Sequence, residues 1–458
     1  MNKRTLGLII GILVAVIINW LPLHGLAAAG KMCLALTLMT VVFWAFQIAQ
    51  SGYVSGIFLA LLVIFKVAPV DKVFYSWSGS TMYLVIGAYL IASAVKNSGL
   101  GERIAYAFIL KFVSSYRSII ISIFVLTFIL SLLIPHPWPR AFLIMSVMAV
   151  VIQSTKMPKE DAIKVGFTVF ASSVPVSLIF LTGDSVINPL AVEASQKALS
   201  WLGWFLYMGV PSLISSILTC ILILVLFKPT SDVAVNKEEI RAKLASLGKL
   251  TGKEIRTLIW LCIAILLWLT DSIHGINIGW ITLIIAMLMS LPWVGEVLTP
   301  KNWGEVPIHV LLFLTAAMAI GKVGGVTGMN TWIATTLLPP TVPHNLFILA
   351  AFIAVVSIII HMLLGSVIAV MGVAIPALLV FTGPMGINPL VTTLLVYTAI
   401  AIHYVFPFQH LNMLVGQGEE NGMYTQKETI RLGIPLIAVV FIVMLLVEIP
   451  WWKIVGLL

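Results

Sequence analysis

Polar residues that could bind an ion or a small anion interrupt one long apolar run of the sequence. The interruption reads Thr182-Gly183-Asp184-Ser185-Val186-Ile187-Asn188-Pro189. Gly183 and Pro189 break a helix, and Asp184 puts a carboxylate where a membrane helix meets hydrocarbon. A charged Asp at the centre of such a helix costs about 2.5–3.5 kcal/mol on insertion scales. We interpret the stretch as a binding site on a broken helix; the alternative is a kink with a satisfied structural Asp.

The composition places the chain in a membrane. The 458 residues are 60% hydrophobic and 9% charged, with a mean hydropathy of +1.11, whereas soluble domains carry roughly 25% charged residues. The net charge of +9 comes from 26 Lys and Arg against 17 Asp and Glu. These basic residues stand in short loops, where they set orientation, so nucleic acid is not an expected partner.

The apolar runs predict an all-α polytopic membrane protein with about eleven transmembrane helices. The long polar segment 228–256 carries Lys237, Arg241, Lys243 and further basic residues, so it is expected on the cytoplasmic side. A short surface helix is expected within it, over 238–247. With an odd number of spans, the N-terminus is predicted to be cytoplasmic and the C-terminus outside.

The sequence also contains an internal repeat with an offset of about 229 residues. Residues 98–105 resemble residues 327–334, and the same offset carries the tip 135–137 onto 364–366. The basic piece ending at Arg117 is expected to be a helix on the cytoplasmic surface, or else an ordinary loop. Two inverted repeats, each with a re-entrant hairpin and a broken helix, are typical of transporters.

Each predicted hairpin has a short tip. The first tip is Pro135-His136-Pro137-Trp138-Pro139-Arg140, between arms of twelve to sixteen residues that are short for full spans; two tilted spans are the alternative. The second tip is Gly365-Ser366, and a second polar break follows at Phe408-Gln409-His410-Leu411-Asn412.

The repeat divides the chain into five parts. Residues 1–116 and 257–344 are predicted as scaffold helices, 117–227 and 345–458 as the two halves of a transport region, and 228–256 as the cytoplasmic linker.

This order of elements resembles the divalent anion:sodium symporter family, the dicarboxylate, citrate and sulfate carriers of the ion-transporter superfamily. The motifs that carry the resemblance are Gly99-Leu100-Gly101-Glu102-Arg103-Ile104-Ala105, Trp303 with Thr327-Gly328…Trp332-Ile333-Ala334, and Leu267-Trp268-Leu269-Thr270…His274-Gly275. The resemblance implies a secondary active transporter of small di- or tricarboxylates or sulfate. It further implies alternating access, a homodimer and an inner-membrane location. Enzymatic activity is not expected, because the sequence has no His-Glu-x-x-His, no Gly-x-Ser-x-Gly and no nucleotide-binding glycine loop.

The chain departs from the family at the motifs that bind ligands. The family's Ser-Asn-Thr tips are replaced by the proline-rich first tip and by Gly365-Ser366-Val367. Of its Gly-Thr-Pro-Pro-Asn breaks, only the final asparagines, Asn188 and Asn412, are retained. Sodium is therefore the one cofactor considered, at Ser366 and Asn412, and a proton-coupled or exchange mechanism is the alternative.

The predicted substrate site takes its residues from both tips and both breaks. Its members are Pro135, His136, Pro137, Arg140, Thr182, Gly183, Asp184, Ser185, Asn188, Gly365, Ser366, Gln409, His410 and Asn412.

Several of these residues have alternative roles. Arg140 could contact substrate, form an ion pair with Asp184 or extend to the surface; an Arg140–Asp184 pair is the arrangement predicted. His136 and His410 could be hydrogen-bonded structural histidines, and Trp138 could pack or line the site.

Other functions remain open from the sequence alone. They are a cation/proton antiporter of the same superfamily, a channel, and an intramembrane hydrolase using His136 with Ser172.

Overall fold

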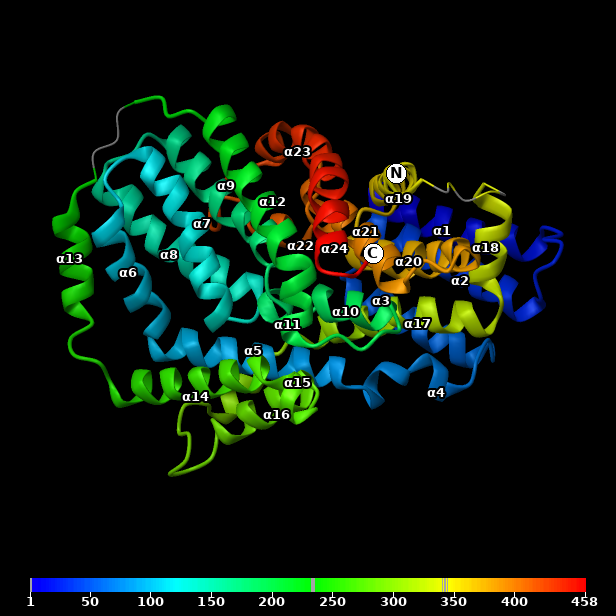
Figure 1. The fold of residues 1–458 in the computed structure, drawn as a ribbon, viewed down its shortest axis with the longest axis horizontal. Helices are drawn as coiled ribbons and strands as arrows, with labels where there is room; N and C mark the ends of the chain where they lie inside the picture. The colour runs from blue at the N-terminus through cyan, green and yellow to red at the C-terminus, as the bar shows by residue number, and fades with distance from the viewer. Residues whose placement is uncertain (1, 232–234, 340, 342, 344) are drawn as a thin grey trace.

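The computed structural model describes residues 2–231, 235–339, 341, 343 and 345–458, and every element in those ranges is a helix (Figure 1). Nine helices are long and apolar enough to cross a membrane, or ten if the bent pair α5 (Ser80–Ser98) and α6 (Leu100–Phe112) forms one span. The sequence predicted about eleven. Three apolar helices of this part of the chain are shorter than a span: α3 (Ser51–Ile64), α16 (Ile278–Leu288) and α21 (Pro389–Ala401).

Two helix ends of the structure lie at the offset of the predicted repeat. Gly99 and Gly328, 229 residues apart, both have a left-handed backbone, with φ of 84° and 77°. Gly99 separates α5 from α6, and Gly328 separates α17 (Ile308–Val326) from α18 (Met329–Leu337). Glycine adopts this conformation without a steric penalty. The opposite orientation of the two repeats in the membrane stays a prediction.

Two helical hairpins follow these bent pairs. The first consists of α7 (Tyr116–Leu133) and α8 (Pro137–Ser154), and the second of α19 (Leu346–Leu364) and α20 (Val367–Thr382). The first arms are eighteen residues each, longer than predicted: α7 begins at Tyr116 after a Ser115 capping box, and Pro137 begins α8 rather than keeping the tip unwound. Proline suits the first helical turn, where its missing N–H has no partner anyway. A re-entrant course for either hairpin stays a prediction.

Both predicted helix breaks are present. After α9 (Lys159–Val176) the chain makes a 3-10 turn over Leu181–Asp184 and restarts as α10 (Ile187–Ala194). After α21 it makes a 3-10 turn over Pro407–Gln409 and restarts as α22 (Leu411–Val415). In Figure 1, α7–α9 lie on one side and α17–α20 on the other, with α10 and α22 between them.

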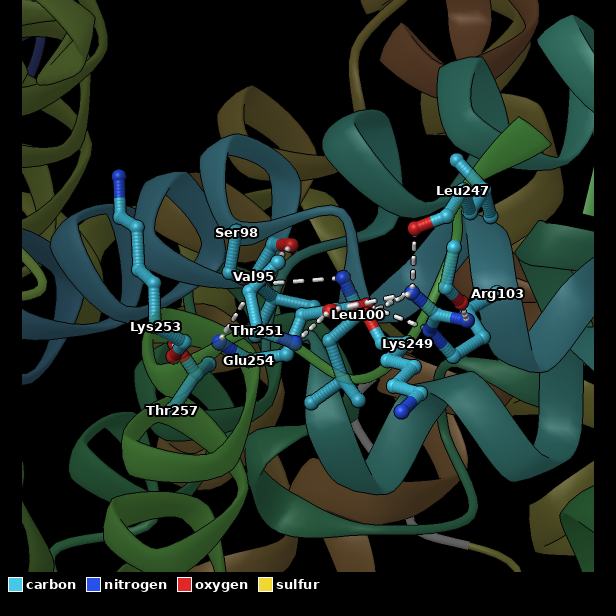
Figure 2. Close-up of polar contacts among 11 residues, drawn as sticks. Val95, Ser98, Leu100, Arg103, Leu247, Lys249, Thr251, Lys253, Glu254 and Thr257 are labelled. Atoms are coloured by element: carbon cyan, nitrogen blue, oxygen red, sulfur yellow. Dashed lines mark hydrogen bonds and ion pairs between the residues drawn. The ribbon is translucent and has the colours of Figure 1, made fainter.

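The linker helix is also present, as α13 (Lys237–Ser246). Figure 2 shows Arg103 of α6 holding this linker to α14 (Gly252–Leu269). Its Nε lies 2.6 Å from Glu254 Oε1, and its two Nη atoms donate to the carbonyls of Leu247, Gly248 and Lys249. The hydrogen bond from Arg103 lowers the pKa of Glu254. The segment 100–112 is therefore a helix and not a loop, and it packs on the linker.

Candidate functional site

The first break is held open by Asn188. Its Nδ2 donates to the carbonyls of Ser177, Phe180 and Leu181, and its Oδ1 accepts from the hydroxyl of Tyr397 on α21. Unpaired carbonyls in hydrocarbon are costly, so this amide satisfies groups that the unwound chain exposes. Asn188 thus joins the first break to the helix that leads into the second.

Asp184 and Arg140 do not form the predicted ion pair. Asp184 Oδ1 accepts from the N–H groups of Val186 and Ile187, at 3.0 and 3.2 Å. Arg140 is fully buried, and its Nη atoms donate to Ser177 Oγ at 2.5 Å and to the carbonyls of Ile134 and Gly183. The prediction was wrong because unwound backbone supplies partners to both groups: N–H groups to the carboxylate and carbonyls to the guanidinium.

His136 joins the first tip to a helix that the sequence did not single out. Its Nε2 is 2.7 Å from the hydroxyl of Tyr89 on α5, and its Nδ1 is 3.5 Å from Ser185 Oγ. Trp138 packs edge-on against the same ring, with centroids 5.2 Å apart. The hydrolase alternative required Ser172 beside His136, but Ser172 lies beside Thr127 and the Val169 carbonyl.

Gln409 is a structural residue of the second break. Its Oε1 accepts from the N–H groups of Val405 and Phe406, at 2.6 and 2.7 Å, and its Nε2 donates to the His361 carbonyl. The ring of His361 in turn donates from Nε2 to the Gln409 carbonyl. The amide therefore ties the second break to the end of α19, as Asn188 ties the first break to α21.

His410 and Asn412 keep unused hydrogen-bond donors. His410 Nδ1 accepts from the Asn412 N–H at 3.4 Å, so the neutral ring carries its proton on Nε2. Neither His410 Nε2 nor Asn412 Nδ2 has a partner among the described residues, although the side chains are only 3% and 2% exposed. Buried donors without a partner are uncommon, so both atoms are suited to a ligand.

A cavity of about 60 Å³ lies between the two tips and the two breaks. One water needs roughly 10–15 Å³ of such space, so the cavity has room for a few waters or one small anion. Six of the fourteen predicted site residues line it: His136, Asp184, Ser366, Gln409, His410 and Asn412. The others do not: Pro135, Pro137, Arg140, Thr182, Gly183, Ser185, Asn188 and Gly365.

Several residues outside the lining support its walls. Thr182 Oγ1 accepts from the Trp201 indole at 3.1 Å. Gly183 has no room for a side chain, since a Cβ there would lie 2.4 Å from the Ser177 carbonyl oxygen. Gly365, with φ of 64°, ends α19 and turns the chain into α20.

Hydrogen-bond donors are concentrated at the second tip and the second break. Val367 and Ile368 line the cavity and begin α20, where the first N–H groups have no partner within the helix and the dipole favours anions. His410 Nε2 and Asn412 Nδ2 add two more donors. The first tip offers fewer hydrogen-bond donors, because prolines 135 and 137 have no N–H. The second tip can therefore bind a carboxylate or sulfate.

The side chains fit sodium poorly. At the second tip and second break the side-chain oxygens of the lining are Ser366 Oγ, Gln409 Oε1 and the Asn412 amide oxygen, and the first two already accept backbone N–H groups. Pro135, His136 and Pro137 supply none. Among the described residues no group of three or more His, Cys, Asp or Glu could hold a metal.

Sequence reasoning missed Tyr89 and Tyr397. Both stand inside apolar helices, where a tyrosine is ordinary, and both contacts join positions far apart in the chain. Nothing in the local sequence distinguishes them.

A small cavity lined by both polar and apolar side chains, between two broken helices and two hairpins in a bundle of helices long enough to span a membrane, is typical of a secondary transporter. The family model described as "Sodium:sulfate symporter transmembrane region" matches residues 2–458, and the chain belongs to that family. It is therefore a membrane transporter of the sulfate and dicarboxylate type and not an enzyme.

Named relatives agree with this class. A membrane protein of Cupriavidus necator is 23% identical, covering 94% of this chain and 89% of that protein. The putative malate transporter YflS of Bacillus subtilis is 24% identical, covering 73% and 72%. The chloroplastic dicarboxylate transporter 1 of Spinacia oleracea is 26% identical, covering 72% and 60%.

Proposed function

We propose that the chain carries small dianions, C4 dicarboxylates or sulfate, across the cell membrane by alternating access, with the cavity between the two breaks as the substrate site. The observation that carries this proposal is the pair of donors without a partner among the described residues of the second break, His410 Nε2 and Asn412 Nδ2, in residues that line the same cavity as the start of α20. Relatives named as malate and dicarboxylate transporters support the substrate class.

The substrate is expected to lie with one anionic group at the second tip. His410, Asn412 and the first residues of α20 line the cavity and carry these donors, and Asp184 lines the same cavity. Two like charges in a small cavity repel, so Asp184 fixes which end of the cavity an anion occupies. The remaining predicted residues position these groups: Arg140 and Asn188 hold the first break, and Gln409 holds the second.

A second cavity supports a route to the linker side. It has a volume of about 410 Å³ and is lined by Lys96, Glu102, Phe142 and Glu305, among others. It shares Tyr89 and Trp138 with the central cavity. We propose that these two side chains form the inner gate, which opens when the transport region moves against the scaffold.

The orientation and assembly of the protein also stay proposals. We expect the linker inside, the C-terminus outside, a location in the inner membrane and a homodimer. Sodium coupling at Ser366 and Asn412 follows only from the family resemblance. A cation/proton antiporter is the second candidate, because Asp184 is a carboxylate lining the cavity.

Transport by purified protein in liposomes tests the proposal. Uptake of radiolabelled malate, succinate and sulfate should saturate, and unlabelled anion inside should accelerate it by counter-exchange. A channel would show neither behaviour. Sodium or potassium flux driven by a pH gradient, without anion uptake, would establish the antiporter instead.

A further inference from the structure

A second buried carboxylate lies away from the substrate cavity, in the last membrane span. Glu448 belongs to the span Gln426–Ile454 and is 0% exposed. Its Oε1 accepts from Thr398 Oγ1 at 2.5 Å, while its Oε2 has no partner among the described residues. An ionisable residue inside a membrane segment is costly and marks a function unless it is paired.

The backbone at Glu448 is unusual. Residues Ile442–Glu448 form a π-helix, and Pro450 follows within the next turn. Proline supplies no N–H to the helix, and π segments are frequent at functional sites. The first half has the same arrangement of a π-helix followed by a proline, over Phe205–Gly209 and Pro211. The position equivalent to Glu448 is there Gly209, so only the second half carries a carboxyl.

The first π segment lies against α24 (Ile449–Ile454), the helix that follows the second π segment. The indole of Trp451 donates to the Leu206 carbonyl at 2.7 Å, and that of Trp452 donates to the Tyr207 carbonyl at 2.9 Å. Helix α12 (Val210–Leu226) also packs on the second π segment (Figure 1). Glu448 is therefore enclosed where the last spans of the two halves meet.

No cation faces this carboxyl from the helices packed around it. Helix α12 has no charged residue and only Cys220 that titrates; α19 has only His361, and α21 only Tyr397, both with other partners. In α23 (Gln426–Phe441), the groups Lys427, Glu428 and Arg431 lie in the first two turns, and Lys453 of α24 (Ile449–Ile454) stacks on Phe347. No ion pair of Glu448 occurs among the described residues.

Hydrogen bonding favours the neutral acid in this conformation. An ionised carboxylate offers about four acceptor positions, and here only one donor reaches them. A proton on Oε1 reverses the contact: the carboxyl O–H donates to Thr398 Oγ1, and the threonine hydroxyl turns to a carbonyl of its own helix.

Helix α21 connects this carboxyl to both breaks. Thr398 follows Tyr397, whose hydroxyl donates to Asn188 in the first break. The same helix ends at Ala401 and continues into the second break. A change in the protonation of Glu448 therefore acts on the helix that both halves of the substrate site share.

We propose that Glu448 is the proton-binding residue that couples proton movement to anion transport. One proton from water on one side of the membrane adds to the carboxylate and gives the neutral acid, and the same proton leaves to water on the other side in each cycle. Glu448 lines none of the described cavities, so the proton is exchanged when the helices move. The proposal rests on the proposed anion transport.

The test uses full-length protein in liposomes that contain a pH-sensitive dye, with the membrane potential clamped at zero and sodium absent. Adding malate should acidify the interior of wild-type liposomes, and a pH gradient should drive malate accumulation. Glu448→Gln keeps the oxygen that accepts from Thr398 but cannot ionise. It should lose malate-driven acidification by tenfold or more and keep malate counter-exchange within about twofold. Glu448→Asp should retain acidification.

Three results would overturn the proposal. One is malate-driven acidification by Glu448→Gln at the rate of the wild type. Another is malate uptake by the wild-type protein without proton movement. The third is loss of malate counter-exchange in both Glu448→Gln and Glu448→Asp, because the residue then has a structural role. Absence of malate, succinate and sulfate transport by the wild type is a different failure, because it removes the proposed function itself.

Discussion

The carboxylate of Asp184 has backbone partners, the N–H groups of Val186 and Ile187, and no cationic side chain of the described residues lies within ion-pair distance. Its role as acceptor for these two N–H groups and its role as a charge in the cavity can therefore be separated. An asparagine can keep the first role, because its amide oxygen accepts the same hydrogen bonds, while the second role requires ionisation.

We expect Asp184→Asn to fold normally and to lower malate uptake at least tenfold, because the lining loses the charge that orients an anion. Asp184→Ala should in addition lose the two backbone hydrogen bonds, at about 1 kcal/mol of stability. Uptake per folded protein and thermal unfolding in detergent measure the two effects. Unchanged uptake by Asp184→Asn would remove this charge from the mechanism.

At the scale of elements, the two breaks depend on close backbone contact. Gly183 lies against the Ser177 carbonyl, so the turn over Leu181–Asp184 can form only if residue 183 has no side chain. The same turn sets the position of Asp184 in the cavity.

Gly183→Ala should therefore shift the break, reduce stability by about 2 kcal/mol and abolish most malate uptake. Gly56→Ala is the matched control, because Gly56 lies in α3 with open space around it; alanine there should be neutral or slightly stabilising. Equal melting temperatures and uptake for the two variants would show that the contact at Gly183 is unimportant.

The parts of the fold that the sequence predicted are those marked by residues within the same short segment. Glycines, prolines and polar residues in apolar runs mark the breaks near Asp184 and His410, and the hairpin tips, so these elements were found in the right places. Partner choice is not local: Arg140 binds carbonyls rather than Asp184, and Tyr89 contacts His136 across 47 positions. Such contacts depend on how helices pack.

The ion pair between Arg103 of α6 and Glu254 at the end of the linker predicts an effect of pH on stability. The hydrogen bond from Arg103 lowers the pKa of Glu254 from its usual 4.5. A lowered carboxyl pKa stabilises the folded state at pH values above the usual pKa, and this contribution is lost as the pH falls through the folded value.

Glu254→Gln should lower stability by about 2 kcal/mol at pH 7, the size of a hydrogen bond to a charged group. At pH values below the folded-state pKa of Glu254 the variant and the wild type should converge. Melting temperatures across this pH range in detergent provide the measurement, and a constant difference at every pH would contradict the account.

At the scale of the whole molecule, residues from both halves line one cavity. His136 and Asp184 come from the first half, and Ser366, His410 and Asn412 from the second. Helix α21 carries contacts to the first break and leads into the second. Movement of either half therefore changes the shape of the substrate site, which alternating access requires.

The topology expected for two inverted halves can be tested by cysteine labelling. Single cysteines at Ser231 and Leu458, each exposed, should react with a membrane-impermeant reagent from opposite sides, Ser231 from the cytoplasm and Leu458 from outside. Labelling of both from the same side would exclude the inverted arrangement.

The most direct test of the central claim is anion binding by the purified protein, measured calorimetrically with malate, succinate and sulfate. At least one of them should bind to a single site. Asn412→Ala should weaken that binding about tenfold or more, since a hydrogen bond to a charged group contributes about 1.5–3 kcal/mol. Asn421→Ala, which alters an amide bonded to the Gln417 carbonyl outside the cavity lining, should bind like the wild type. Wild-type affinity in Asn412→Ala would contradict the assignment of this cavity as the substrate site.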